Sequence, residues 1–145
     1  MAQYSIAGRS TVAGTSLRAL FSLFGIAGVG GVIREIGVCN TTTTAVNIAL
    51  VRLTNATGVG AGLTEAEYDE DAPPPSCTGF AGHTADGGVG QVIRQWTLGA
   101  AVGSGVIWTF GGKGLIIQPG TANGFGVIIP NGTGQICDYY VDWEE

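Results

Sequence analysis

Residues 31–54 read GVIREIGVCNTTTTAVNIALVRLT and carry the clearest structural pattern in the chain. Over residues 31–39, Val32, Arg34, Ile36 and Val38 share one face of a strand, because strand side chains alternate with a period of two. Residues 45–54 alternate in the same way, and four threonines at 41–44 separate the two runs. The segment therefore predicts two β-strands joined by a polar turn, as a β-hairpin or a strand–loop–strand pair.

Similar short runs recur along the rest of the chain, at residues 4–9, 91–98, 105–110, 114–118, 124–129 and 135–143, with a weaker one at 78–84. Gly and Pro turns separate them, which is typical of an antiparallel sandwich or barrel. We therefore predict an all-β, antiparallel, jelly-roll-like β-sandwich; residues 17–26 fit either a strand or a short helix. The residues expected in its core are Ile36, Val38, Ile48, Leu50, Val106, Trp108, Ile116 and Val127.

Two regions differ from this pattern. Residues 1–30 are rich in Gly, Ala and Leu, and we expect an extended N-terminal segment, a possible arm, before a sandwich domain at 31–145. Residues 58–76 hold five of the eleven acidic residues and three consecutive prolines at 73–75, which exclude helix and central strand. This region is expected to be a solvated loop or an arm held extended by proline. Residues 1–30, 60–76 or both are expected to reach a neighbouring subunit.

Composition excludes several classes of protein. The chain has 145 residues, enough for one domain, and a net charge of −5, the wrong sign for a nucleic-acid binder. It is 45% hydrophobic, which excludes a disordered tail. Charged residues make up 12%, against a usual value of about 25%. Depletion of charge is typical of surfaces that contact a partner, so composition favours a component of an assembly over a soluble domain with neutral loops.

No targeting signal is visible in the sequence. The N-terminal residues lack a secretory pattern, and the apolar stretch 17–33 is broken by four glycines, so no membrane-spanning helix is expected. We expect synthesis in the cytoplasm and no contact with a membrane.

No motif indicates catalysis. The three cysteines are widely spaced, so neither a disulfide framework nor a zinc site is expected, and Cys39 and Cys137 are expected to be buried. His83 is the only histidine, and no serine or cysteine lies in a nucleophile-elbow context. The glycine runs lack the phosphate-binding motifs. We therefore expect no enzyme activity, no cofactor and no metal.

The segments IREIGVCNTTTTAVNIALVRLT and LGAAVGSGVIWTFGGKGLIIQPGTANGFGVIIPNGTGQICDYYVDWEE resemble small structural proteins of tailed-bacteriophage particles, which are head decoration (cement) proteins or minor tail proteins. The resemblance implies a β-sandwich that assembles on a virus particle, as a trimer. The expected function is decoration and stabilisation of the outer capsid surface, with the major capsid protein as partner.

The oligomer interface is expected on the C-terminal strand and its neighbour. Its residues would be Phe125, Val127, Tyr139, Tyr140 and Trp143. The residues expected to contact the capsid or a neighbouring subunit are Leu20, Phe21, Phe24, Tyr68 and Pro74.

Two alternatives remain open at this point. A tail-tip or fibre protein could bind a host glycan through Trp96, Trp108 or Trp143, although aromatic residues more often serve packing. Decoration predicts that these tryptophans are buried, whereas glycan binding predicts at least one in an exposed groove. A hydrolytic enzyme on the same fold would require His83.

Overall fold

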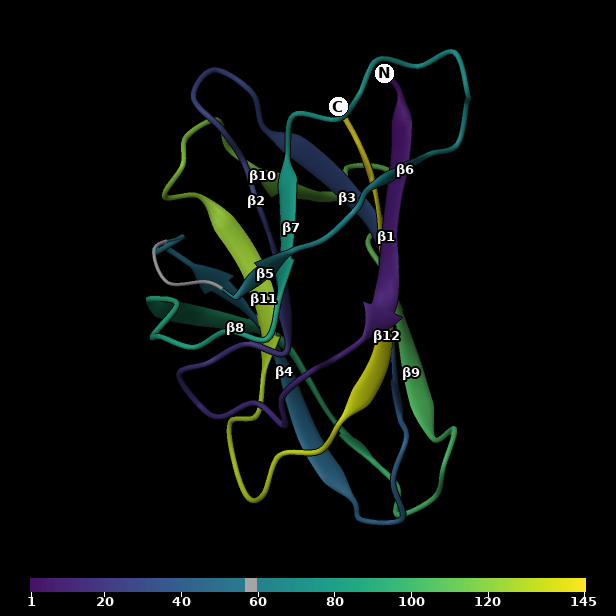
Figure 1. Ribbon diagram of the computed structural model, residues 1–145, viewed down its shortest axis with the longest axis vertical. Helices are drawn as coiled ribbons and strands as arrows, with labels where there is room; N and C mark the ends of the chain where they lie inside the picture. The colour runs from purple at the N-terminus through teal and green to yellow at the C-terminus, as the bar shows by residue number, and fades with distance from the viewer. Residues whose placement is uncertain (57–59) are drawn as a thin grey trace.

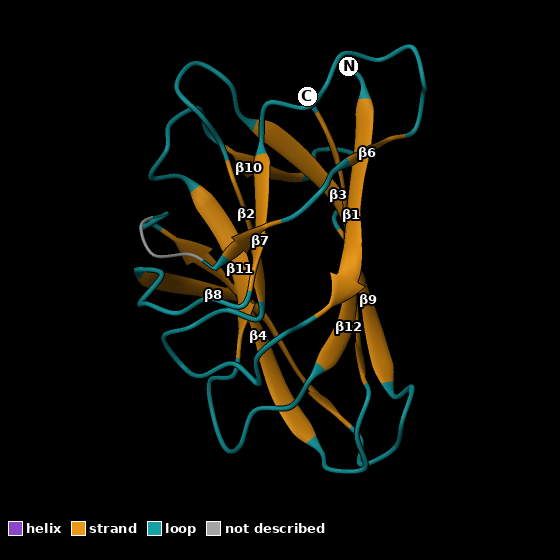
Figure 2. Ribbon diagram, in the orientation of Figure 1, coloured by secondary structure: helices purple, strands orange, loops and turns teal. Residues whose placement is uncertain are grey.

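In the computed structural model, residues 1–56 and 60–145 are described, and every regular element among them is a β-strand (Figures 1 and 2). The first two residues of the predicted loop 58–76 lie outside the described residues. None of the described residues belongs to a helix that could cross a membrane.

Twelve strands form two antiparallel sheets that face each other (Figure 2). Sheet 1 contains β1 (Gln3–Arg9), β3 (Gly31–Asn40), β6 (Ala66–Glu67), β9 (Gly105–Thr109), β10 (Leu115–Ile117) and β12 (Cys137–Glu144). Its order is β10-β3-β12-β1-β6, and β9 also pairs with β3. Sheet 2 contains β2 (Phe21–Phe24), β4 (Val46–Leu53), β5 (Ala61–Gly62), β7 (Thr78–Ala81), β8 (Val89–Leu98) and β11 (Gly124–Ile128), in the order β5-β7-β2-β11-β4-β8. The predicted all-β antiparallel sandwich is confirmed.

The two halves of the quoted hairpin segment lie in different sheets. β3 belongs to sheet 1 and β4 to sheet 2, so the threonine turn is a crossover between sheets and not a hairpin. Asn40 is fully buried and fixes this crossover, because its Nδ2 donates to the carbonyls of Thr44 (2.7 Å) and Gly99 (3.0 Å). Of the two alternatives, the strand–loop–strand pair is therefore correct.

The main core lies between the sheets and includes six of the eight predicted core residues: Ile36, Val38, Ile48, Leu50, Trp108 and Val127. Val106 is only partly buried. Ile116 was predicted wrongly: it is 46% exposed, because Leu115 and Ile117 point into the core and the residue between them faces outward.

A second apolar cluster covers the outer face of sheet 2. Ala49, Val51 and Leu53 alternate with the core residues of β4 and pack with Ala19 and Phe24. β4 is therefore buried on both faces. Ala19, which lies just before β2, helps to cover the outer face of β4. The region 17–26, left open between strand and helix, contains β2.

The N-terminal segment 1–30 is part of the sandwich. β1 lies between β12 and β6, with Gln3 opposite Glu144 and Arg9 opposite Asp138, and β2 lies between β7 and β11. The structure therefore has no domain boundary at residue 30, because the strands before and after it belong to the same two sheets. The burial of Ile6 and Phe21 between the sheets explains why these strands are ordered within the domain.

The acidic, proline-containing region is also attached to its own chain. β6 pairs with β1, and the Tyr4 hydroxyl donates to the Pro73 carbonyl (2.8 Å). The Glu145 carboxylate accepts from the backbone N–H groups of Ser76 (2.8 Å) and Cys77 (3.0 Å). These contacts hold the loop against the sheet 1 edge near both chain termini (Figure 1).

Candidate interaction surfaces

The residues predicted to form the oligomer interface lie mostly inside the molecule. Phe125, Val127, Tyr139 and Trp143 are buried, and only Tyr140 is partly exposed. In β12 the odd-numbered positions point into the core and the even-numbered positions point outward. An interface through the four buried aromatic and apolar residues would therefore require the core to open.

The residues predicted to contact the capsid or a neighbouring subunit are also partly buried and partly exposed. Leu20, Phe21 and Phe24 are buried in the two clusters, so they are not available on the surface. Tyr68 is 60% exposed and Pro74 is exposed, both in the acidic loop. Of this set, only the loop residues remain accessible to a partner.

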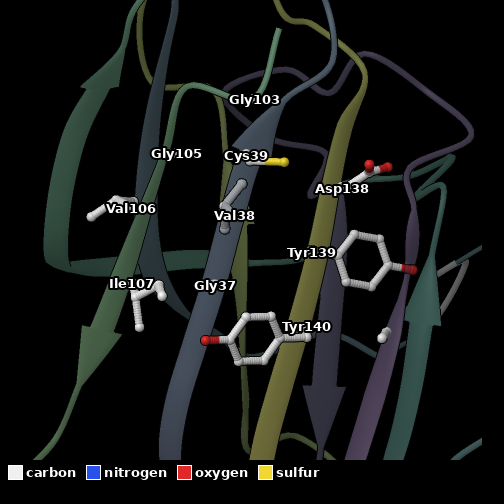
Figure 3. A pocket seen from close by; sticks show the side chains of 11 residues that line it. Gly37, Val38, Cys39, Gly103, Gly105, Val106, Ile107, Asp138, Tyr139 and Tyr140 are labelled. Atoms are coloured by element: carbon white, nitrogen blue, oxygen red, sulfur yellow. The ribbon is translucent and has the colours of Figure 1, made fainter.

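A shallow groove of about 640 Å³ lies on the outer face of sheet 1 (Figure 3). Gly37 forms its floor, and the Tyr140 ring lies across this glycine, so that a Cβ on residue 37 would lie 2.0 Å from Tyr140 Cε1. Val106 and Ile107 line one side, and Asp138 lies on the other. The lining is mainly apolar, which suits an apolar side chain better than a polar ligand.

Two polar contacts fix the side chains around this groove. The Tyr140 hydroxyl donates to Glu35, and burial together with this carboxylate raises the pKa of Tyr140 far above its usual value. Arg9 forms a bidentate ion pair with Asp138 (2.6 and 2.9 Å), which holds the pKa of that carboxyl below its usual value.

Cys39 also lines the groove and is partly exposed, contrary to the prediction that it is buried, because it lies on the outward face of β3. Cys137 points into the core and is buried as predicted. Burial raises the pKa of the Cys77 and Cys137 thiols to about 12. These two thiols are therefore protonated at neutral pH, and Cys39 is the only one of the three at a surface.

A second surface was not recognised in the sequence. Five of the eight exposed large apolar side chains among the described residues belong to β8, β9, β10 and the β8–β9 connection: Val92, Trp96, Val102, Ile107 and Ile116. We refer to β8, β9, β10 and the connections between them, residues 89–117, as the β8–β10 edge; β8 is an edge strand of sheet 2, and β9 and β10 both pair with β3 in sheet 1. β8 is an edge strand that pairs only with β4, and Leu98 is its one buried residue. The feature of the sequence that could have indicated this surface is the scarcity of charge in residues 89–98, where Arg94 is the only charged residue.

Trp96 is the one tryptophan at the surface. It is 57% exposed, in a shallow recess with Asn47, Gln95 and Thr97. The Asn47 amide is fixed in this recess, because Nδ2 donates to Thr97 Oγ1 (3.0 Å) and Oδ1 accepts from Gln95 Nε2 (2.9 Å). Trp108 and Trp143 are buried, so neither forms an exposed aromatic platform. The expectation under capsid decoration that all three tryptophans are buried is therefore wrong for Trp96, whereas its exposure agrees with the expectation under glycan binding.

His83 is buried and forms a polar pair with Ser22. Ser22 Oγ and His83 Nε2 are 2.6 Å apart, and His83 Nδ1 has no hydrogen-bond partner among the described residues. Ser22 is fully buried between β7 and β11, so its hydroxyl is closed to a substrate in this conformation. Within residues 1–56 and 60–145, no group of histidine, cysteine and acidic side chains is arranged to hold a metal ion.

Burial makes His83 a source of pH-dependent stability. It lowers the pKa of His83 to about 4, from 6.5 in an unfolded chain. The unfolded state therefore binds a proton that the folded state does not, so stability is complete above pH 6.5 and falls as the pH drops toward 4. We expect the native protein to lose roughly 2 kcal/mol of unfolding free energy between pH 7.5 and 5.

The variant His83→Gln keeps a polar side chain at this position but removes the titration. We expect urea unfolding of this variant to be nearly independent of pH over the same range. Equal pH dependence in both proteins would show that His83 is not the responsible group.

Comparison of the chain with protein-family models, with curated proteins and with solved structures finds no match.

Proposed function

We propose that the protein is a structural component of a bacteriophage particle that decorates and stabilises the outside of the capsid as a symmetric oligomer. Its partner is the major capsid protein. The sequence resemblance of residues 31–54 and 98–145 to small phage structural proteins supports this proposal, together with the low content of charged residues.

The observation that carries the proposal is the β8–β10 edge. Five large apolar side chains are exposed on these three strands and their connections, and such exposed apolar side chains are typical of a region that is covered in the functional assembly. A long edge strand also presents unpaired backbone groups, which a partner strand can satisfy. The 10-residue β8 has both features and only one charged residue.

The order of the strands supports a jelly-roll topology. With β9 and β10 counted as one broken strand and the β5–β7 segment left out, the sheets have the orders β1-β12-β3-β9/β10 and β2-β11-β4-β8. Two interlocked Greek keys of eight strands produce this arrangement. The β5–β7 segment then adds short strands beside β1 and β2.

Stabilisation of a shell follows from binding across its seams. A protein that binds the assembled lattice more strongly than the free capsid subunits shifts the equilibrium toward the lattice. Several contacts from one oligomer strengthen the attachment, even when each contact is weak.

The proposal is tested by adding purified protein to undecorated capsids of the phage that encodes it. We expect saturation at hundreds of copies per particle and a higher melting temperature of the shell. The variant Ile107→Ser should bind more weakly, whereas Leu17→Ser, which changes an exposed residue outside the β8–β10 edge, should bind normally. A few copies per virion, located at the tail, would contradict decoration.

A second function is favoured by the exposure of Trp96. An exposed indole beside neutral amide and hydroxyl groups is suited to stack on a sugar ring and hydrogen-bond its hydroxyls. On this alternative the protein belongs to a tail tip or fibre and binds a host glycan. Binding of the native protein to host-cell polysaccharide, lost in Trp96→Ala, would support it; equal binding by both proteins would exclude Trp96 as the site.

A further inference from the structure

Charged residues are strongly segregated in this fold. No acidic residue occurs between Glu35 and Glu65 or between Asp86 and Asp138. These stretches contain all of β4, β8, β9, β10 and β11, so the β8–β10 edge carries no carboxylate. The acidic region 65–71 lies at the opposite edge of sheet 1, where β6 pairs with β1.

The acidic segment 67–71 is attached to β1 and has no basic partner among the described residues. Glu67, Asp69, Glu70 and Asp71 are exposed, and neither salt bridge among the described residues involves them. The backbone N–H of Tyr68 donates to the Gln3 carbonyl (2.9 Å). The segment therefore begins beside β1, and Figure 1 shows the loop that follows β6 passing close to the N-terminal end of this strand. Its exposed carboxylates make it a negatively charged segment.

The β8–β10 edge holds two basic residues, Arg94 and Lys113, and Arg52 of β4 reaches it; none of the three has a carboxylate partner among the described residues. The Arg94 guanidinium lies over the Phe110 ring, 5.9 Å from its centroid, and Lys113 lies in the turn that follows Phe110. Arg52 Nη1 donates to the Ile116 carbonyl (2.7 Å). Burial lowers the pKa of Arg52, as expected for a cation held away from water without a counter-ion.

We infer that the acidic segment 67–71 of one copy docks on the β8–β10 edge of the next copy, in a head-to-tail contact. The inference rests on the symmetric oligomer of the proposed function and specifies its contact. Within one molecule β6 and β10 lie at opposite ends of sheet 1, and β8 is an edge strand of sheet 2, so the acidic segment and the β8–β10 edge can pair only between molecules. A two-fold contact between identical edges would bring like charges together, whereas a head-to-tail contact brings opposite charges together.

A second copy is favoured as the occupant because this chain itself carries the complementary charge. The net charge of −5 repels another copy at long range, but charges separated by more than about 8 Å are screened at physiological salt. Local pairing of acidic and basic side chains then decides the orientation. Docking would also cover apolar side chains of the edge, including Ile116. A contact made only by the charged side chains would leave them exposed.

The experiment uses two variants that each neutralise one surface. Arg94→Gln/Lys113→Gln alters the basic edge, and Glu70→Gln/Asp71→Asn alters the acidic segment. Sedimentation velocity at physiological ionic strength should show an oligomer for the native protein and about tenfold weaker association for each variant alone. Arg18→Gln is the matched control: it removes an exposed positive charge outside the edge and should assemble like the native protein.

Mixing the two variants separates a head-to-tail contact from a two-fold contact. Each mixed pair retains one intact acidic segment and one intact basic edge, so we expect a 1:1 complex that does not grow further. The inference is overturned if the mixture stays monomeric, if neither variant weakens the native oligomer, or if the native protein is monomeric at high micromolar concentration. A monomeric protein that still saturates capsids would overturn this contact but leave decoration intact.

Discussion

Replacing Ile48 with aspartate is expected to prevent stable folding. Ile48 has no exposed surface and lies in the middle of β4, in the core between the sheets. The substitution removes a buried apolar side chain and places a carboxylate among the apolar side chains of the core. Together these effects cost more than about 5 kcal/mol, which is the whole stability of many domains.

Ile116→Asp is the matched control for this prediction. Both residues were expected in the core, but Ile116 is 46% exposed on the outer face of β10. We expect its unfolding free energy to change by less than about 1 kcal/mol, measured by urea denaturation at a protein concentration that keeps the chain monomeric. Cooperative unfolding of Ile48→Asp at the native midpoint would contradict the position of β4 between the two sheets.

Replacing Trp143 with alanine is expected to cost about 3–5 kcal/mol, the range found when large aromatic side chains are removed from cores. Trp143 has no exposed surface and packs against Tyr4, with 5.7 Å between ring centroids. Its Nε1 donates to Glu145 Oε1 (3.0 Å), and the same carboxylate holds the backbone of Ser76 and Cys77. The substitution therefore leaves a cavity and also loosens the end of the acidic loop.

Trp96→Ala provides the comparison, because it removes the same side chain from an exposed position. We expect its effect on unfolding free energy to stay below about 1 kcal/mol. Limited proteolysis should cut the 60–76 region faster in Trp143→Ala than in Trp96→Ala. Equal stability of the two variants would show that Trp143 is not a core residue.

The local features of the fold could be predicted from the sequence. The period-two alternation at 31–39 and 45–54 and the Gly and Pro turns depend only on neighbouring residues. They were sufficient to predict an all-β sandwich and to identify Ile36, Ile48 and Trp108 as core residues. The same local reasoning does not show which strands pair, so the 31–54 segment was equally consistent with a hairpin and with a crossover.

Long-range pairing decided the features that the sequence did not reveal. β1 is ordered because it pairs with β12, and the partners Gln3 and Glu144 are separated by almost the entire chain. For this reason residues 1–30 were interpreted as a separate segment. The aromatic residues of β12 were correctly recognised as large and apolar, but only the second sheet determines that Tyr139 and Trp143 face inward.

The candidate interaction surface depends on sheet order in the same way. Trp96 lies opposite Ile48 in the β4–β8 pair, yet it is exposed because β8 is the edge strand of its sheet. The sequence by itself determined which residues are apolar, which segments are extended and where charge is scarce. Only the tertiary structure decided which of those apolar residues are covered, because burial depends on the strands that lie on either side and in the opposite sheet.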